Sequence, residues 1–418
     1  MASKNTSECR VSQNQRIFIL NNVCGPLTSM GKALKQLGHQ VAFFEADPNG
    51  CRDLEQAKTA ISQFNPDVIL QQNFNVYMLS GDFGGQLLDW IESSGFKQAF
   101  WFLTRPECLS ERHTFEKWVE QGYFKSANFL CVSEAMSSFF TDNALKASFL
   151  PVAIEAQTAQ PIADTSSDGV ISYFSNTFTG HPNSPVDAVL ATLGNQEPAL
   201  RYFMQVITSY FPAHDPQTII GYIIKPVRRF FSSIDINFFA HQRKRQVLEK
   251  ELQHLPMPLV HAVLHQVEFV YTDYVSCAIH QQIKPLIQHT GGSAFWDAVA
   301  QSAPRSGVET ACQLDNPTFK PGTVVTFSPF LTMTAPSSAP LAVIASGNQL
   351  ICQYSPELSE LVPDEYVLSY KSIDALIGHI EQVNENKADL SEQKAAAQAH
   401  VLAHHTYQQR AQQLLDLL

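Results

Sequence analysis

Long apolar segments are the feature that this 418-residue sequence most clearly lacks. No apolar run approaches the roughly 20 residues that a helix needs to cross a bilayer. The longest pure runs, such as residues 99–103, have the length of buried strands. Residues 1–15 are polar and lack the apolar core of a signal peptide. We therefore expect a cytoplasmic protein with no membrane span.

Paired cysteines are also missing. The eight cysteines occur singly along the chain, and no two of them have CxxC spacing. This argues against a disulfide framework and against a cysteine-based zinc site. Two histidine pairs with i, i+4 spacing could chelate a metal on a helix face, namely His261 with His265 and His400 with His404. Neither pair has an HExxH glutamate or an identifiable third ligand, so the sequence predicts no metal site.

The signatures of common nucleotide cofactors are absent as well. The loop after the first predicted strand, residues 22–26, has a single glycine before Gly31, so it does not form a GxGxxG motif. No P-loop and no GxSxG motif occurs, which leaves kinase and serine hydrolase interpretations without support. We expect no resident cofactor.

Positive charge is in short supply. Lysine and arginine number 28 against 39 acidic residues, which gives a net charge of −11 at pH 7. Such a chain repels phosphate backbones on average. The only dense basic groups lie at residues 225–229 and 243–245, and no known nucleic-acid motif accompanies them. Solvated charges on helix faces are the simpler interpretation, and we expect no nucleic-acid partner.

The sequence does contain enough apolar material for about two domains, since 44% of its residues are hydrophobic. In the first half, short β-rich runs alternate with helical stretches, which predicts a parallel sheet with right-handed crossovers. The predicted strands are residues 16–21, 40–45, 68–71, 98–103, 128–132 and 147–150. The predicted helices are residues 28–37, 53–64 and 87–93.

The second half begins after a small, polar segment at residues 156–168, which has the composition of a linker. Between about 195 and 300 the alternation fades, and helical spacing predicts a mainly helical elaboration with helices at 243–255 and 258–289. The predicted strands of this half are residues 170–175, 323–327, 349–353 and about 366–369. Its remaining predicted helices are residues 341–346, 372–384 and 391–417.

These patterns together predict an α/β protein with two Rossmann-like domains facing each other, residues 1–158 and 168–418, the second carrying the helical elaboration. Strand ends and helix N-termini present main-chain amides at the carboxyl edge of a parallel sheet, and ligands bind at such edges. We therefore expect a ligand site between the two domains.

The motifs and their order resemble those of CgeB-type glycosyltransferases. The resemblance is carried in the first half by RIFILNN, LKQLGHQVAFFE, FNPDVIL, FWFLTRPE and FLPVAI, and in the second half by SSAPLAVIASGNQLICQYSPEL and HHTYQQRAQQLLDLL. It implies a GT-B fold and transfer from a nucleotide-activated sugar. The donor would lie on the C-terminal domain and the acceptor on the N-terminal one, with no bound metal.

Two departures from the family pattern affect the expected site. Residues 104–107 (TRPE) replace an acidic DDP segment, and residues 337–340 (SSAP) stand where relatives have Arg and Glu. Arg105 and Glu107 then lie just past the fourth strand, where they either line the cleft or form an ordinary loop salt bridge.

The expected acceptor side consists of residues that follow strands of the first domain: Asn22, Gly25, Asn73 and Arg105. An ordinary βα turn is the alternative for residues 22–26. The expected catalytic residues are His181 and Glu107, with His181 as general base or phosphate contact and a plain turn histidine as the alternative. The expected donor-binding residues are Thr177, Lys225, Arg228, Ser328, Ser337, Ser338 and Glu357.

The sequence thus predicts a glycosyltransferase that moves a sugar from a nucleotide-sugar donor to an unidentified acceptor, for which a protein and a glycan are the candidates. The departures at residues 337–340 favour an alternative, a catalytically degenerate GT-B scaffold that serves as a binding or assembly subunit. That alternative implies a protein partner or a homo-oligomer. A periplasmic-type small-molecule binder is a third interpretation, against which the polar N-terminus counts.

Overall fold

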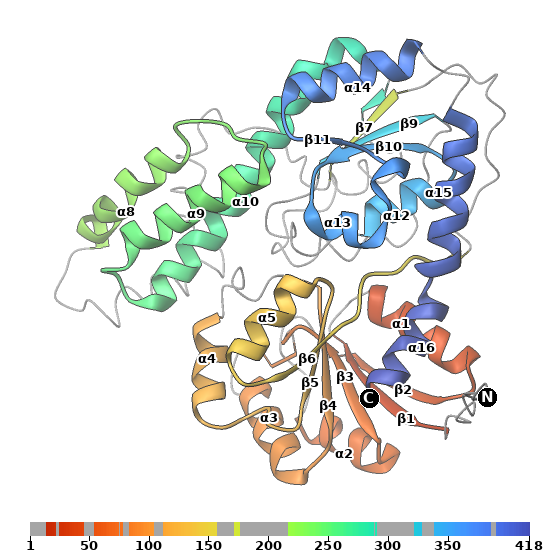
Figure 1. Cartoon of the computed structure of the whole chain (residues 1–418). Helices are drawn as coiled ribbons and strands as arrows, with labels where there is room; N and C mark the ends of the chain where they lie inside the picture. Colours follow the sequence, from red (N-terminus) through yellow and green to blue (C-terminus); the bar gives the residue numbers. More distant parts are fainter. Residues whose placement is uncertain are drawn as a thin grey trace, which may run out of the picture.

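Figure 1 shows the computed structural model of the protein, in which two α/β lobes lie one above the other and a group of helices extends to one side. The described parts of the chain are residues 14–21, 25–45, 54–74, 76–77, 83–103, 112–156, 171–175, 216–287, 289–290, 322–327, 338–385 and 390–418.

The N-terminal lobe is built on a six-stranded parallel sheet with strand order β2-β1-β3-β4-β5-β6. Its strands are β1 (Arg16–Asn21), β2 (Gln40–Glu45), β3 (Val68–Gln72), β4 (Gln98–Phe102), β5 (Asn128–Cys131) and β6 (Lys146–Phe149). Its helices are α1 (Gly25–Gln36), α2 (Leu54–Phe64), α3 (Phe83–Ser94), α4 (Arg112–Glu120) and α5 (Glu134–Asp142). β3 and β4 are buried along their whole length, as expected for central strands with both faces covered.

The C-terminal lobe is built on a five-stranded parallel sheet with strand order β11-β10-β9-β7-β8. Its strands are β7 (Ile171–Ser175), β8 (His289–Thr290), β9 (Thr323–Phe327), β10 (Gln349–Gln353) and β11 (Leu368–Tyr370). The helices that follow β9 along the chain are α12 (Ser338–Ala345), α13 (Pro356–Leu361), α14 (Ile373–Glu385), α15 (Leu390–His404) and α16 (Tyr407–Leu417).

Both faces of the second sheet are covered, and alternate residues of β10 show this directly. Leu350 and Cys352 face the hydrophobic core that also holds α12, α15 and the N-terminal lobe. Ile351 faces a second core, which the sheet shares with α14 and with α8 (Pro216–Phe230), α9 (Phe238–Leu252) and α10 (Met257–Ile283). Successive side chains of a strand point to opposite faces. A strand that is covered on both faces, such as β10, therefore has consecutive apolar residues.

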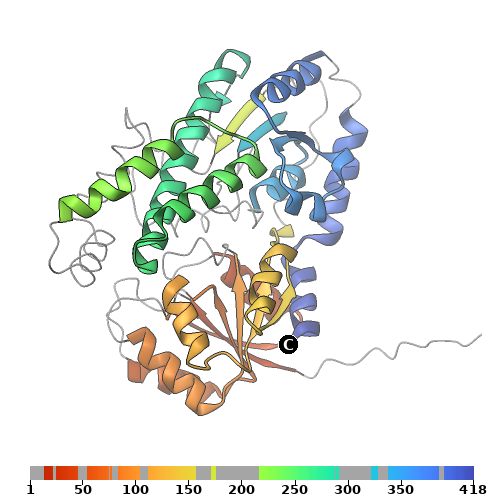
Figure 2. The same ribbon diagram turned by 60° about the vertical axis from the view of Figure 1, so that its left-hand side comes forward.

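Helices α8 to α10 form a helical module beside the two lobes (Figures 1 and 2). The buried Tyr173 hydroxyl on β7 contacts Ser276 on α10, hydrogen-bonding its main-chain oxygen at 3.0 Å and its Oγ at 2.9 Å. Inside the module, the Glu268 carboxylate pairs with Arg245 Nε at 2.8 Å and lies 3.5 Å from His241. α10 also packs against α4, so the module contacts both lobes. None of the helices in the described parts of the chain has the length and apolar character that a membrane span requires.

The chain crosses between the lobes twice, and the two passages lie side by side. We call residues 151–154 and 404–410 the crossing. The Ile154 N–H donates to His405 O at 2.9 Å, and the Tyr407 N–H donates to Ile154 O at 3.0 Å. After the second passage α16 packs along α1 of the N-terminal lobe. The C-terminal helix thus fastens the two lobes to each other.

Arg410 is the centre of the crossing and is only 1% exposed. Its Nε donates to the main-chain oxygens of Pro151 at 2.9 Å and Val152 at 3.2 Å, and its Nη1 donates to His404 O at 3.0 Å. Its Nη2 contacts Nδ1 of His405. A guanidinium can only donate, so Nδ1 accepts and the ring proton lies on Nε2, which donates to Leu361 O at 2.8 Å.

The predicted strands and most predicted helices are confirmed, but the prediction of one closing helix over residues 391–417 is wrong. The segment forms two helices that are interrupted at His405 and Thr406. Thr406 is the N-cap of α16, and its N–H donates to the Gln409 side chain at 3.1 Å. This capping replaces the main-chain bonds that a continuous helix would have made. Helices α4, α5, α8 and α13 and the short strand β8 were not predicted as separate elements. Residues 157–168 of the predicted linker lie outside the described parts of the chain.

Candidate functional site

The carboxyl edge of the C-terminal sheet gathers polar side chains where β10 and β11 end. We call Gln353, Tyr354, Ser355, Glu357 and Lys371 the β10 edge. Gln353 is the last residue of β10 and is buried. Its side-chain amide donates to the main-chain oxygen of Ile236, which lies between α8 and α9. The helical module is therefore attached to this edge of the sheet.

Tyr354 presents an aromatic ring at the β10 edge. Its main-chain N–H donates to Tyr370 O at 2.8 Å, which fixes the residue beside the end of β11. The Lys371 ammonium lies 3.8 Å from the Tyr354 ring centroid, within cation–π range. The Phe239 ring of α9 lies 6.3 Å away, centroid to centroid. An aromatic surface with a neighbouring cation is suited to a planar, anionic ligand.

Glu357 supplies a fixed carboxylate three residues after Tyr354. It lies in the first turn of α13, is 4% exposed, and accepts a hydrogen bond from the Ser355 hydroxyl at 2.6 Å. A carboxylate can accept several hydrogen bonds and is suited to ligand hydroxyls. Phosphate oxygens are disfavoured beside it because like charges repel.

Glu360, on the same short helix, lies against the N-terminal lobe. The main chain of Glu134, the first residue of α5, hydrogen-bonds its carboxylate. Burial raises the pKa of Glu360 above its usual value, the carboxylates of Glu134 and Glu357 raise it further, and the main-chain hydrogen bond lowers it in part. The two lobes therefore approach each other next to Glu357.

The corresponding edge of the N-terminal lobe uses its polar groups differently. Asn73 follows β3 with a φ of 48°, and it is 2% exposed. Its N–H donates to Trp101 O at 3.0 Å, and its Oδ1 accepts from the Leu103 N–H at 3.0 Å. Ser133 caps α5 by accepting from the Met136 N–H at 3.2 Å. These side chains hold the main chain of their own lobe together.

The structure describes six of the thirteen residues that the sequence assigns to the acceptor side, to catalysis and to donor binding. Gly25 is the first residue of α1 and Ser338 the first of α12, and both are partly exposed. Glu357 and Asn73 lie as given above. Asn22, Arg105, Glu107, Thr177, His181, Ser328 and Ser337 lie outside the described parts of the chain.

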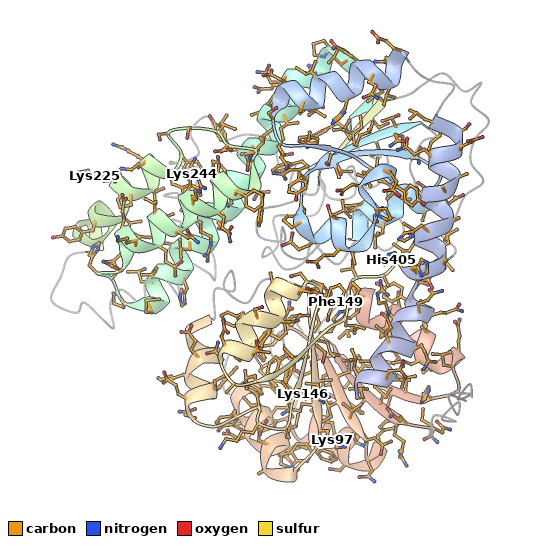
Figure 3. The ribbon with its side chains drawn as sticks, viewed as in Figure 1. Lys97, Lys146, Phe149, Lys225, Lys244 and His405 are labelled. Atoms are coloured by element: carbon orange, nitrogen blue, oxygen red, sulfur yellow. The ribbon has the colours of Figure 1, made fainter. Side chains whose placement is uncertain are left out.

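Lys225 and Arg228 are exposed on α8 and are not brought to the β10 edge. Figure 3 shows Lys225 on the outlying helix, far from His405 at the junction of the lobes. The His400 and His404 rings lie 4.9 Å apart, and His400 Nε2 hydrogen-bonds Leu361 O at 3.0 Å. The described residues contain no group of three or more potential metal ligands among His, Cys, Asp and Glu.

Sequence reasoning missed Tyr354 and Lys371. Each residue directly follows a strand, so the same rule that selected Asn73 could have selected both. It could not have shown that they meet, because their contact depends on the pairing of β10 with β11.

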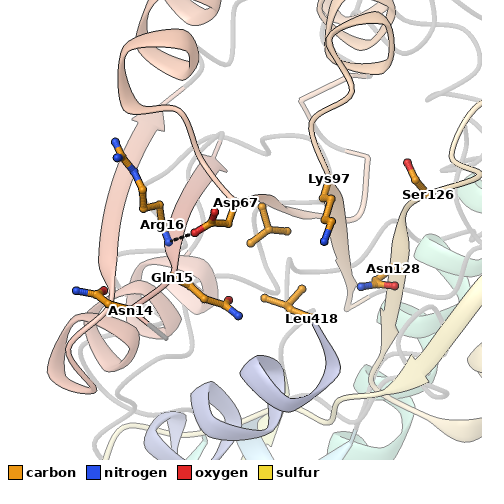
Figure 4. A pocket seen from close by; sticks show the side chains of 9 residues that line it. Asn14, Gln15, Arg16, Asp67, Lys97, Ser126, Asn128 and Leu418 are labelled. Carbon is orange, nitrogen blue, oxygen red and sulfur yellow. Dashed lines mark hydrogen bonds between the residues drawn. The ribbon is translucent and has the colours of Figure 1, made fainter. Parts of the chain in front are cut away.

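A hollow of about 630 Å³ opens at the opposite, amino edge of the N-terminal sheet (Figure 4). Here the Arg16 N–H donates to Asp67 Oδ2 at 2.7 Å, and the Lys97, Ser126 and Asn128 side chains lie around the opening. Lys97 and Ser126 are exposed. Ligands of parallel α/β sheets bind at carboxyl edges, so this hollow is not the candidate site.

Residues 332–416 match the family model described as Glycosyl transferase-like. The match begins just before α12, includes β10, α13 and β11, and ends in α16. It therefore contains the whole β10 edge and the second passage of the crossing. No curated protein matches the chain.

Several solved structures resemble the whole chain. A sucrose-phosphate synthase from Thermosynechococcus elongatus aligns over 96% of this chain and 98% of its own, with 11% identity and a TM-score of 0.50. Anabaena Alr3699/HepE in complex with UDP and glucose aligns over 96% and 98%, with 12% identity and a TM-score of 0.45. A UDP-forming α,α-trehalose-phosphate synthase from Burkholderia xenovorans aligns over 96% and 98%, with 10% identity and a TM-score of 0.43. The first likeness supports the fold, and the two parallel lobes are those of the GT-B fold.

Proposed function

We propose that the protein is a glycosyltransferase that transfers a sugar from a nucleotide-sugar donor to an acceptor hydroxyl. The observation that carries this proposal is the glycosyl transferase-like match over residues 332–416, because it covers the β10 edge. The GT-B arrangement of the lobes and the resemblance to CgeB-type enzymes agree with it.

The β10 edge is where we place the donor. The Tyr354 ring would stack on the nucleotide base, with the Lys371 cation beside it. The Glu357 carboxylate would accept hydrogen bonds from sugar or ribose hydroxyls, since Ser355 already orients it. Ser338, at the start of α12, would lie on the diphosphate side.

The reaction breaks the bond between the anomeric carbon and the diphosphate oxygen, and forms a bond from that carbon to the acceptor oxygen. The nucleoside diphosphate leaves, and a base takes the acceptor proton. His181 and Glu107 are the residues we propose for this base, and Asn22, Gly25 and Arg105 for the acceptor side. Helix N-termini and basic side chains would neutralise the departing diphosphate.

The experiment is a calorimetric binding series with UDP-glucose, GDP-mannose and dTDP-glucose on the full chain. We expect at least one of them to bind, and Glu357→Gln to weaken that binding about tenfold or more, because a hydrogen bond to a charged group contributes about 1.5–3 kcal/mol. Glu381→Gln is the matched control. Glu381 is exposed on α14, and its replacement removes the same charge at a position away from the β10 edge. Absence of binding by all three donors, or equal affinity in the two variants, would contradict the proposal.

One observation favours a second candidate, a GT-B scaffold that binds a nucleotide without transferring sugar. α12 is apolar and buried from Ala339 to Ala345, and it has no acidic residue in its first turn. Donor breakdown separates the two functions. Release of nucleoside diphosphate in the presence of mixed acceptors supports a transferase, and tight binding with no release supports the scaffold.

A further inference from the structure

The outward side of α9 carries alternating apolar and basic side chains. Arg243, Val247 and Lys250 recur at helical spacing, and all three are exposed. The opposite stripe of α9 is buried in the module and includes Leu248 and Leu252. Val247 is 52% exposed, although an apolar residue on a helix usually faces the core.

α8 repeats this arrangement on the neighbouring helix. Tyr222, Lys225 and Arg228 are exposed, and Tyr222 is 56% exposed. Ile223 and Val227 are buried on the other side of the same helix. α8 and α9 pack against each other, so the two exposed stripes lie on adjacent helices. We call Tyr222, Lys225, Arg228, Arg243, Val247 and Lys250 the α8–α9 surface. Phe239, at the start of α9, lies beside Tyr354 at the β10 edge and is not part of it.

The charge of this region is opposite to that of the chain. Residues 216–257 contain seven basic and three acidic residues, whereas the whole chain has a net charge of −11. Arg245 is buried with Glu268, and Arg229 pairs with Glu251. No described acidic side chain forms an ion pair with Lys225, Arg228, Arg243 or Lys250. Five of the seven exposed large apolar side chains in the described residues also lie in this segment.

We propose that the α8–α9 surface docks on an anionic membrane surface. Clustered lysines and arginines bind anionic lipid headgroups, and exposed Tyr and Val side chains enter the interfacial layer between them. A nucleic acid would use the cations but leave the apolar side chains in water. Figures 1 and 2 show α8 at the outer end of the module, away from both sheets, where a flat surface can reach it. The inference is independent of the proposed sugar transfer.

The test is co-sedimentation of the full chain with phosphatidylcholine vesicles that contain or lack phosphatidylglycerol. We expect binding only with phosphatidylglycerol, and weaker binding at high salt. Each basic side chain near such a surface strengthens binding about fivefold, so Lys225→Gln, Arg228→Gln and Arg243→Gln together should lower the partition coefficient about a hundredfold. Tyr222→Ser with Val247→Ser should lower it about tenfold.

The matched control is Lys32→Gln, Lys117→Gln and Lys125→Gln, which removes the same charge from exposed positions of the N-terminal lobe. It should change the partition coefficient by less than about threefold. Equal losses in the two triple variants, or no binding to phosphatidylglycerol vesicles, would overturn the proposal. A partition coefficient that is unchanged by Tyr222→Ser with Val247→Ser would mean that the surface binds polyanions in general. That result would overturn the membrane proposal as well. All changed residues are exposed, so circular dichroism should show unchanged folding.

Discussion

The crossing and the β10 edge lie at opposite ends of α13, and they use polar side chains for different purposes. At the crossing, Arg410 is buried and donates to the main-chain oxygens of Pro151, Val152 and His404. At the β10 edge, Lys371 is exposed and contacts the Tyr354 ring, and Glu357 binds the Ser355 side chain.

The difference between the two regions distinguishes side chains that hold the fold together from side chains that are available to bind a ligand. A buried guanidinium that satisfies main-chain oxygens of two distant segments fixes how the chain passes between the lobes. Charged and aromatic side chains that meet at the carboxyl edge of a parallel sheet lie where such sheets bind their ligands. Substitutions in the crossing should therefore act on stability, and substitutions at the β10 edge on binding.

Arg410→Met should have the largest effect. It leaves the two buried carbonyl oxygens of Pro151 and Val152 and the partly buried one of His404 without their donor, and each unsatisfied buried group costs about 1–3 kcal/mol. We expect the free energy of unfolding to fall by about 3 kcal/mol or more, measured by urea denaturation. Arg410→Lys keeps the charge and one donor group, so its free energy of unfolding should lie between those of the wild type and Arg410→Met. A loss below about 1 kcal/mol for Arg410→Met would show that the crossing does not fasten the lobes.

The pH dependence of stability should report His405. Burial, with the Arg410 charge next, lowers the pKa of His405 from 6.5 to about 4 in the folded protein. The folded-state pKa is depressed, so the unfolded chain takes up the proton first as the pH falls. The free energy of unfolding that depends on a neutral His405 ring is fully present above pH 6.5. It is lost progressively as the pH falls to 4. The loss should reach about 3 kcal/mol.

The measurement is urea denaturation at several pH values between 7.5 and 4.5 for the wild type and His405→Gln. Gln does not titrate, so the variant should show a shallower decline of stability over this range. Identical pH profiles would place the titration elsewhere, with His241 as the next group to examine, since burial lowers its pKa too.

Lys371→Met should have the smallest effect and only on binding. An exposed cation–π contact contributes about 0.5–1 kcal/mol, so nucleotide-sugar affinity should fall about three- to fivefold. The melting temperature should stay within about 2 °C, because Lys371 is exposed. Isothermal titration calorimetry measures the change in affinity, and thermal melting measures the change in melting temperature. A large drop in melting temperature with unchanged affinity would reverse the roles of the two regions.

Much of the fold follows from the sequence, because buried parallel strands appear as short apolar runs. Residues 16–21, 323–327 and 349–353 were predicted with the bounds that the structure gives. α4 and α5 were missed because each has only nine residues and too few apolar repeats to show a helical period. The break before α16 has a local signal, since Thr406 and Gln409 have capping-box spacing.

The candidate site could be predicted only in part. Glu357 was selected from its place after a strand, and the structure puts it at the β10 edge. Arg410 could not be predicted as a buried residue, because arginine is usually exposed and its partners at residues 151–152 lie more than 250 positions away. Long-range partners of this kind are set by tertiary packing and leave no local pattern.

The most direct test of the central claim is hydrogen–deuterium exchange of the full chain with and without UDP-glucose, GDP-mannose or dTDP-glucose. The claim is that a nucleotide-sugar binds at the β10 edge. We expect slower exchange with at least one donor at residues 353–361 and 370–372, with the crossing unchanged. No protection at these residues with any of the three donors, or protection confined to residues 72–74 and 103 of the N-terminal lobe, would contradict the claim.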